Sequence, residues 1–134
     1  MKGIADTGFL VAFVSRNDFH HDWAEHLARQ WEEPFLTCES VLSETAFHLG
    51  SSRAIFEMPG RGFITPAFNC NDRLQQLENL DRRYADRGAD FADLCLIRMS
   101  ELFPKYPVIT PDRDEFRVYR RNKREVIPLI CPPE

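Results

Sequence analysis

Brief apolar runs alternate along the chain with longer segments in which apolar residues recur at helical spacing. Brief runs bounded by proline, glycine or acidic residues indicate buried strands. Strands are expected at residues 3–5, 35–38, 63–65, 107–110 and 126–130. This alternation predicts an α/β fold with a mostly parallel sheet, and right-handed crossovers place helices on both of its faces.

The segments between the strands are expected to be helices with one apolar face each. Asn17 or Asp18 is placed to cap the second helix, which Pro34 ends, and Ser40 is placed to cap the third. Further helices are expected as a short piece within residues 51–62, over 72–84, before Pro104, and briefly over 116–119. The faces expected to be buried contain Phe9, Leu10, Phe13 and Val14; Phe19, Trp23, Leu27 and Trp31; Val41, Leu42, Ala46, Phe47 and Leu49; Leu74, Leu77, Leu80 and Tyr84; and Phe116, Val118 and Tyr119.

The helix before Pro104 is apolar on most sides, which is typical of a buried helix. Asp90 is expected at its N-cap, where a carboxylate accepts backbone N–H groups. Asp93 is then the third helical residue, a position that favours acids because of the helix dipole. The side chains expected to be buried are Phe91, Leu94, Cys95, Leu96, Ile97, Met99, Leu102 and Phe103.

Four carboxylates that are far apart in the sequence are expected to meet at one edge of the sheet. Asp6 directly follows the first strand, and Asp112 lies just beyond the fourth. Glu44 and Asp93 lie near the beginnings of helices that start at the same edge. In open α/β sheets, ligand sites form outside the carboxyl ends of the strands. The sequence therefore predicts an acidic site at this edge.

A divalent cation resolves the repulsion between four such carboxylates, which are costly to bury without a partner. Ligands that are all oxygen select hard ions, so Mg²⁺ or Mn²⁺ is expected rather than zinc. The chemistry that suits this arrangement is phosphodiester hydrolysis, with one or two ions activating water and stabilising charge on phosphate oxygens.

Length and composition are those of a globular protein. The 134 residues predict one domain over 1–134, and the net charge of −4 argues against non-specific coating of nucleic acid. The four cysteines form no C-x-x-C motif, so they are expected to be reduced thiols in a cytoplasmic protein. Asp6 interrupts the first apolar stretch, so no signal peptide is expected. The apolar run over residues 8–14 is too short to span a bilayer.

Four short motifs carry a family resemblance: IADT at 4–7, VLSE at 41–44, DFADL at 90–94 and TPDRDEF at 110–116. Together, in this order, they resemble the PIN domains, of the kind found as the toxin of VapBC toxin–antitoxin modules. The resemblance implies an α/β/α sandwich and a Mg²⁺- or Mn²⁺-dependent endoribonuclease that hydrolyses RNA in the cytoplasm.

Carried over by position, the resemblance assigns catalysis and metal binding to Asp6, Glu44, Asp93 and Asp112. Thr7 and Thr110 match the hydroxyl positions beside the first and last acids. Asp90 and Asp114 are further acids for which capping is the first interpretation. A small antitoxin partner and a homodimer are also implied. Residues 51–62 depart from the family pattern, which leaves the contacts with such partners open.

Other features leave alternatives. The basic residues Arg113, Arg117, Arg120, Arg121, Lys123 and Arg124 form either a solvated helix or contacts to phosphate. His20, His21 and His26 are expected at the surface, and Trp23 and Trp31 in the core. A receiver domain, a haloacid-dehalogenase-type phosphatase and an inactive PIN-like module that binds RNA or protein are the rival classes. A dehalogenase would need a second aspartate at the position of Gly8, and a receiver a pair of acids after the first strand.

Overall fold

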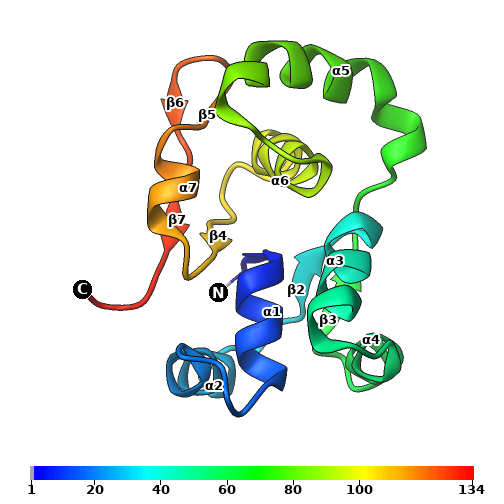
Figure 1. Cartoon of the computed structure of the whole chain (residues 1–134), viewed down its shortest axis with the longest axis vertical. Coiled ribbons are helices and arrows are strands. Elements are labelled where there is room, and N and C mark those ends of the chain that lie inside the picture. Colours follow the sequence, from blue (N-terminus) through cyan, green and yellow to red (C-terminus); the bar gives the residue numbers. More distant parts are fainter. Residues whose placement is uncertain (1) are drawn as a thin grey trace.

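The computed structural model describes residues 2–134, and its centre is a parallel sheet with the strand order β3-β2-β1-β4-β7 (Figure 1). Neighbouring strands all pair in parallel, with Ile4 opposite Leu36 on one side and Val108 on the other. The five strands are β1 (Ile4–Ala5), β2 (Phe35–Thr37), β3 (Ile64–Pro66), β4 (Val108–Ile109) and β7 (Leu129–Ile130). The predicted α/β class and parallel sheet are confirmed.

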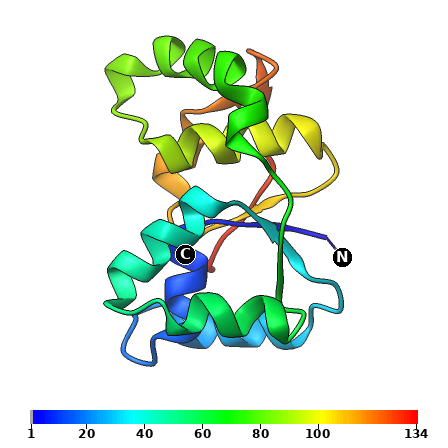
Figure 2. The same ribbon diagram turned by 90° about the vertical axis from the view of Figure 1, so that its right-hand side faces the viewer.

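Helices cover both faces of the sheet, which gives three layers. Figure 2 shows α5 and α6 above the sheet and α1, α2 and α4 below it, while α3 lies beside it and packs on both α1 and α6. The helices are α1 (Thr7–Val14), α2 (His21–Arg29), α3 (Glu39–Leu49), α4 (Arg53–Gly60), α5 (Leu74–Arg83), α6 (Phe91–Leu102) and α7 (Arg113–Arg117), with short 3₁₀ turns η1 (Cys70–Arg73) and η2 (Ala85–Arg87).

The core lies on both faces of β1, whose two residues are fully buried. Below the sheet, the ring of Phe9 packs edge-on against Phe35 at 4.9 Å and Trp23 at 5.8 Å. Trp31 stacks on Phe35 at 5.0 Å, so both tryptophans pack against the core as expected. Above the sheet, α6 is buried over most of its circumference, as its composition predicts.

Five apolar side chains that were expected inside are exposed. Phe19 precedes α2, because that helix begins at His21. Phe47 lies on the side of α3 opposite Val41 and Thr45, since two residues beyond Thr45 is about 200° around the helix. The remaining three lie at or just beyond helix ends, where periodicity does not decide burial. The exposed residues are Phe19, Phe47, Leu74, Phe91 and Val118.

Several predicted helix boundaries are corrected. The N-caps of α2 and α3 are His20 and Cys38, neither with a capping side-chain hydrogen bond. Asp18 instead accepts the N–H of His20 at 2.8 Å, which forms the turn before α2. That helix ends at Arg29, so Pro34 lies well beyond it. Residues 51–62 contain the expected short helix, α4, and residues 72–84 divide between η1 and α5.

The predicted last strand at 126–130 is wrong, because Pro128 interrupts it and Val126 is exposed. Two strands replace it: β7 in the main sheet, and β6 (Glu125–Val126), which pairs with β5 (Arg120–Arg121) as an antiparallel hairpin. The left-handed conformations of Asn122 and Lys123 turn the chain between β5 and β6.

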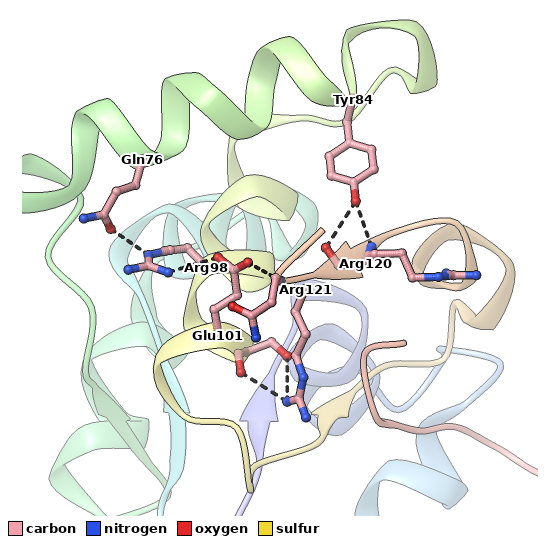
Figure 3. Close-up of polar contacts among 8 residues, drawn as sticks. Gln76, Tyr84, Arg98, Glu101, Arg120 and Arg121 are labelled. Atoms are coloured by element: carbon pink, nitrogen blue, oxygen red, sulfur yellow. Dashed lines mark hydrogen bonds and ion pairs between the residues drawn. The ribbon is translucent and has the colours of Figure 1, made fainter. Parts of the chain in front are cut away.

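The β5–β6 hairpin is fastened to α6 and to the end of α5 (Figure 3). The hydroxyl of Tyr84 donates to the carbonyl of Arg120 at 3.1 Å and accepts its N–H at 2.8 Å. The guanidinium of Arg121 donates to the carbonyls of Pro104 at 2.8 Å and Ser100 at 3.3 Å. Two residues of the basic cluster therefore serve as structural anchors.

The cysteines are free thiols. Cys38, Cys70 and Cys95 nevertheless gather between β2, η1 and α6, with the sulfurs of Cys70 and Cys95 3.5 Å apart. The pKa of Cys38 is lowered to about 6, first by its contact with Cys95 and then by Ser40. None of the helices within residues 2–134 combines the length and apolar character needed to cross a lipid bilayer.

Candidate active site

The strand order reverses between β1 and β4. From β1 the chain adds β2 and β3 on one side of the sheet, and it then adds β4 and β7 on the other side of β1. Ligands bind at such a switch point in open α/β sheets. Asp6 follows β1 and Asp112 follows β4, so both lie at this place. A pocket of about 270 Å³ opens there, and Asp6, Glu44, Asp93 and Asp112 all line it.

Asp6 is the most buried acid of the pocket, and it is the N-cap of α1. Its Oδ1 accepts the backbone N–H of Phe9 at 2.8 Å. Burial raises the pKa of Asp6 from 3.8 to about 7, although hydrogen bonds from Thr110 and Phe9 lower it in part. The negative charges of Asp93 and Asp112 raise the pKa of Asp6 further, because they oppose its ionisation.

Asp93 is the third residue of α6, as expected, and Asp90 is the cap. The Oδ1 atom of Asp90 accepts the N–H of Asp93 at 2.9 Å. The hydroxyl of Tyr119 donates to Oδ2 of Asp93 at 2.9 Å, and this hydrogen bond is buried. Burial raises the pKa of Asp93, while contacts with Glu115 and Tyr119 oppose part of that rise. Asp90 itself is exposed and outside the pocket lining.

Glu44 reaches the pocket from the second turn of α3 and is half-buried. Burial raises the pKa of its carboxyl group, and the negative charges of Asp90 and Asp93 raise it further. Thr7 faces Glu44 closely enough to lower that pKa. The Thr7 hydroxyl is buried and has no well-formed hydrogen bond to any residue of 2–134.

Asp112 is the N-cap of α7 and is exposed on the opposite side of the pocket. Its Oδ1 accepts the N–H of Glu115 at 3.3 Å, and its own N–H donates to Oγ1 of Thr110 at 3.0 Å. Asp114 lies outside the pocket lining and contacts Arg117 at 3.8 Å, so its side chain serves the surface of α7.

Five further residues of the site were not expected from the sequence. Glu115 lines the pocket one helical turn beyond Asp112, a spacing that could have indicated it. The pKa of Glu115 is raised by loss of solvent around its carboxyl group and by its contact with Asp93, although the residue as a whole is exposed. His48 follows Glu44 by four residues and so lies on the same face of α3, a spacing that could also have indicated it. No periodic signal indicates the other three, because they arrive from the loop before α2 and the segment after α7. These are Asp18, His20 and Tyr119.

The approach of α1 to the loop after β4 closes one wall of the pocket. Gly8 has no Cβ atom, and an added one would lie 2.9 Å from the ring of Pro111. This position thus holds glycine for reasons of space, since only glycine lets the start of α1 meet Pro111.

The pocket concentrates negative charge. Six carboxylates and two histidines line it, with no lysine or arginine among its lining residues within 2–134. Within residues 2–134, no group of three or more His, Cys, Asp or Glu side chains is positioned to hold a metal ion. The donors nevertheless fit a hard divalent cation, because they include carboxylate and hydroxyl oxygens, and because burial and nearby negative charges raise the pKa values of Asp6, Glu44 and Asp93.

A comparison with solved structures matches the fold of this chain to that of the Mycobacterium tuberculosis toxin VapC20, described as cleaving the sarcin–ricin loop. The TM-score is 0.74 at 18% sequence identity, over 86% of this chain and 92% of that one. The chain has a PIN-like α/β/α fold. No protein-family model and no curated protein matches the sequence.

The strand order also separates the PIN-like fold from one rival class. When the five parallel strands alone are counted in chain order, the sheet is ordered 3-2-1-4-5. Receiver domains such as CheY have the order 2-1-3-4-5. The receiver interpretation is therefore excluded by topology.

Proposed function

We propose that the protein is a metal-dependent endoribonuclease and the toxin of a toxin–antitoxin pair, with Asp6, Glu44, Asp93 and Asp112 as its catalytic and metal-binding residues. The observation that carries the proposal is the pocket of six carboxylates at the switch point of the sheet. The fold shared with VapC20 supports RNA as the substrate.

Asp6 and Asp93 are buried and face each other's charge, so they would hold a Mg²⁺ or Mn²⁺ ion with Asp112 at the open side. When bound, such an ion supplies an activated water and stabilises charge on the phosphate. Glu44, at the half-buried side beside Thr7, accepts the proton that the attacking water loses. Because no lysine or arginine of residues 2–134 lines the pocket, the carboxylates alone would repel a phosphodiester.

The proposal includes an antitoxin partner and a homodimer, both from the family resemblance. Helices α3 and α4 pack together and offer an apolar surface for a protein partner. On this surface Phe47 is 81% exposed and Phe56 is 78% exposed. Co-expression of a small protein encoded beside this chain should relieve the slowed growth that we expect on expression of the chain alone in a bacterial host.

The test is cleavage of RNA by the purified protein, beginning with a stem-loop of the sarcin–ricin type. We expect cleavage with Mg²⁺ or Mn²⁺, none with EDTA, and loss of most activity in Asp6→Asn, Asp93→Asn and Asp112→Asn. Asp114→Asn is the matched control and should retain activity, because Asp114 lies outside the pocket. Activity that survives chelation would exclude the metal mechanism, and hydrolysis of phosphorylated small molecules instead of RNA would favour a phosphatase. An intact fold without either activity would favour a binding module.

A further inference from the structure

Tyr119 is a buried tyrosine that contacts the candidate site without lining it. It is 2% exposed, and its hydroxyl donates to Oδ2 of Asp93 at 2.9 Å. Tyr119 is absent from the residues that line the pocket. Among the described residues, the bond to Oδ2 of Asp93 is therefore the one side-chain hydrogen bond that joins Tyr119 to a residue of the pocket lining.

The position of the Tyr119 ring is determined by its neighbours. The rings of Tyr84 and Phe116 pack edge-on against it at 5.1 Å and 5.5 Å. The chain directly after Tyr119 is held as well, because Arg120 is bonded at both its N–H and its carbonyl by Tyr84 (Figure 3). Arg121 then fastens the hairpin to the end of α6. The hydroxyl is thus fixed on a rigid support.

We propose that Tyr119 is a positioning residue for Asp93: its hydroxyl fixes the carboxylate in one orientation and leaves the second oxygen for the ligand of the pocket. This inference rests on the proposed function in taking that ligand to be a divalent cation. Hydrogen bonds of this kind orient ligating carboxylates and hold their geometry before a metal binds. A tyrosine hydroxyl carries its proton at neutral pH, so it acts as the donor in this bond.

The β5–β6 hairpin thereby gains a role beyond covering α6. It carries no residue of the pocket lining, yet it anchors the tyrosine that holds Asp93. Hydrogen bonds from Tyr84 and Arg121 hold the hairpin, and the hairpin holds Tyr119 in place beside Asp93, the third residue of α6.

The test removes the hydroxyl groups of two of the three tyrosines of the chain, one at a time. Tyr119→Phe keeps the ring and removes the bond to Asp93, and Tyr106→Phe is the control at a site that contacts Lys2 instead. Mn²⁺ binding by titration calorimetry should weaken about tenfold in Tyr119→Phe and stay unchanged in Tyr106→Phe. In RNA cleavage, kcat should fall while KM stays the same, because Tyr119 does not line the pocket.

A second measurement does not depend on metal or RNA. In EDTA, the ¹³C resonance of the Asp93 carboxyl group, assigned from its loss in Asp93→Asn, should move in Tyr119→Phe and stay in place in Tyr106→Phe. If the wild type binds no Mn²⁺, the proposed function fails and this resonance alone decides the orientation of Asp93. A resonance that does not move overturns the inference, and so does an unchanged Mn²⁺ affinity in Tyr119→Phe.

Discussion

Replacing Asp6 by asparagine is expected to stabilise the metal-free protein at neutral pH. Asp6 is 6% exposed, and burial raises the pKa of its carboxyl group from 3.8 to about 7. Asparagine keeps an oxygen for the N–H of Phe9, which lies 2.8 Å from Oδ1, and it is as good an N-cap as aspartate. The substitution therefore removes the buried charge and retains the start of α1.

The magnitude follows from the linkage between proton binding and unfolding. One pKa unit corresponds to about 1.4 kcal/mol, so ionised Asp6 costs about 4 kcal/mol above pH 7. A buried amide also loses hydration, so we expect Asp6→Asn to be about 2 kcal/mol more stable at pH 8. As the pH falls from about 7 to about 4, folded wild type takes up a proton that the unfolded chain does not. Its stability relative to the variant then rises by about 1.4 kcal/mol per pH unit, which closes the gap near pH 5.5.

The assay is urea unfolding in EDTA at several pH values between about 5 and 8, because the free energy of unfolding extrapolates linearly with urea. Asp114→Asn is the control, since it removes an exposed acid of the same region and should follow the wild type. A gap between Asp6→Asn and wild type that does not change with pH would refute the reasoning. A variant less stable than wild type at pH 8 would show that the charge of Asp6 is compensated within the folded protein.

Three other outcomes are expected. Millimolar Mn²⁺ should raise the melting temperature of the wild type more than that of Asp93→Asn, because the unfolded chain has no assembled site; equal shifts would place Mn²⁺ elsewhere. Gly8→Ala should lose most RNA cleavage and little stability, since its Cβ would press on Pro111 at 2.9 Å; full activity would mean that the wall yields. Arg121→Met should lower the free energy of unfolding by about 2 kcal/mol, because it removes the hydrogen bonds to the Ser100 and Pro104 carbonyls. An unchanged free energy of unfolding would mean that these bonds are not needed to hold the hairpin.

Much of the architecture was predictable because local signals and the final packing agree. Asp6 and Asp112 end strands and begin helices, so strand position and capping chemistry indicate the same places. Asp90 was predictable as a cap, and the structure confirms it. The apolar runs of β1 and β4 also match the sheet, because these two central strands are buried and hydrophobic on both faces.

The errors in burial share a cause: periodicity says which residues lie on one side of a helix, but not whether anything covers that side. Phe47 and Phe19 were expected inside and are exposed, since no element of residues 2–134 packs over them. The β5–β6 hairpin was missed because its strands are charged and are held by side chains distant in sequence, such as Tyr84. Tyr119 was missed as a residue of the site for a similar reason, because it bonds Asp93, which lies 26 residues away in the sequence.

The site is also distributed along the whole length of the chain, from Asp6 at the start to Glu115 and Tyr119 near the end. During synthesis on a ribosome, β1 and α1 emerge before β4, α7 and the hairpin. A growing chain therefore holds Asp6 and Glu44 before the opposite wall of the pocket exists. Any activity of this pocket is withheld until Asp112, Glu115 and Tyr119 have joined the fold.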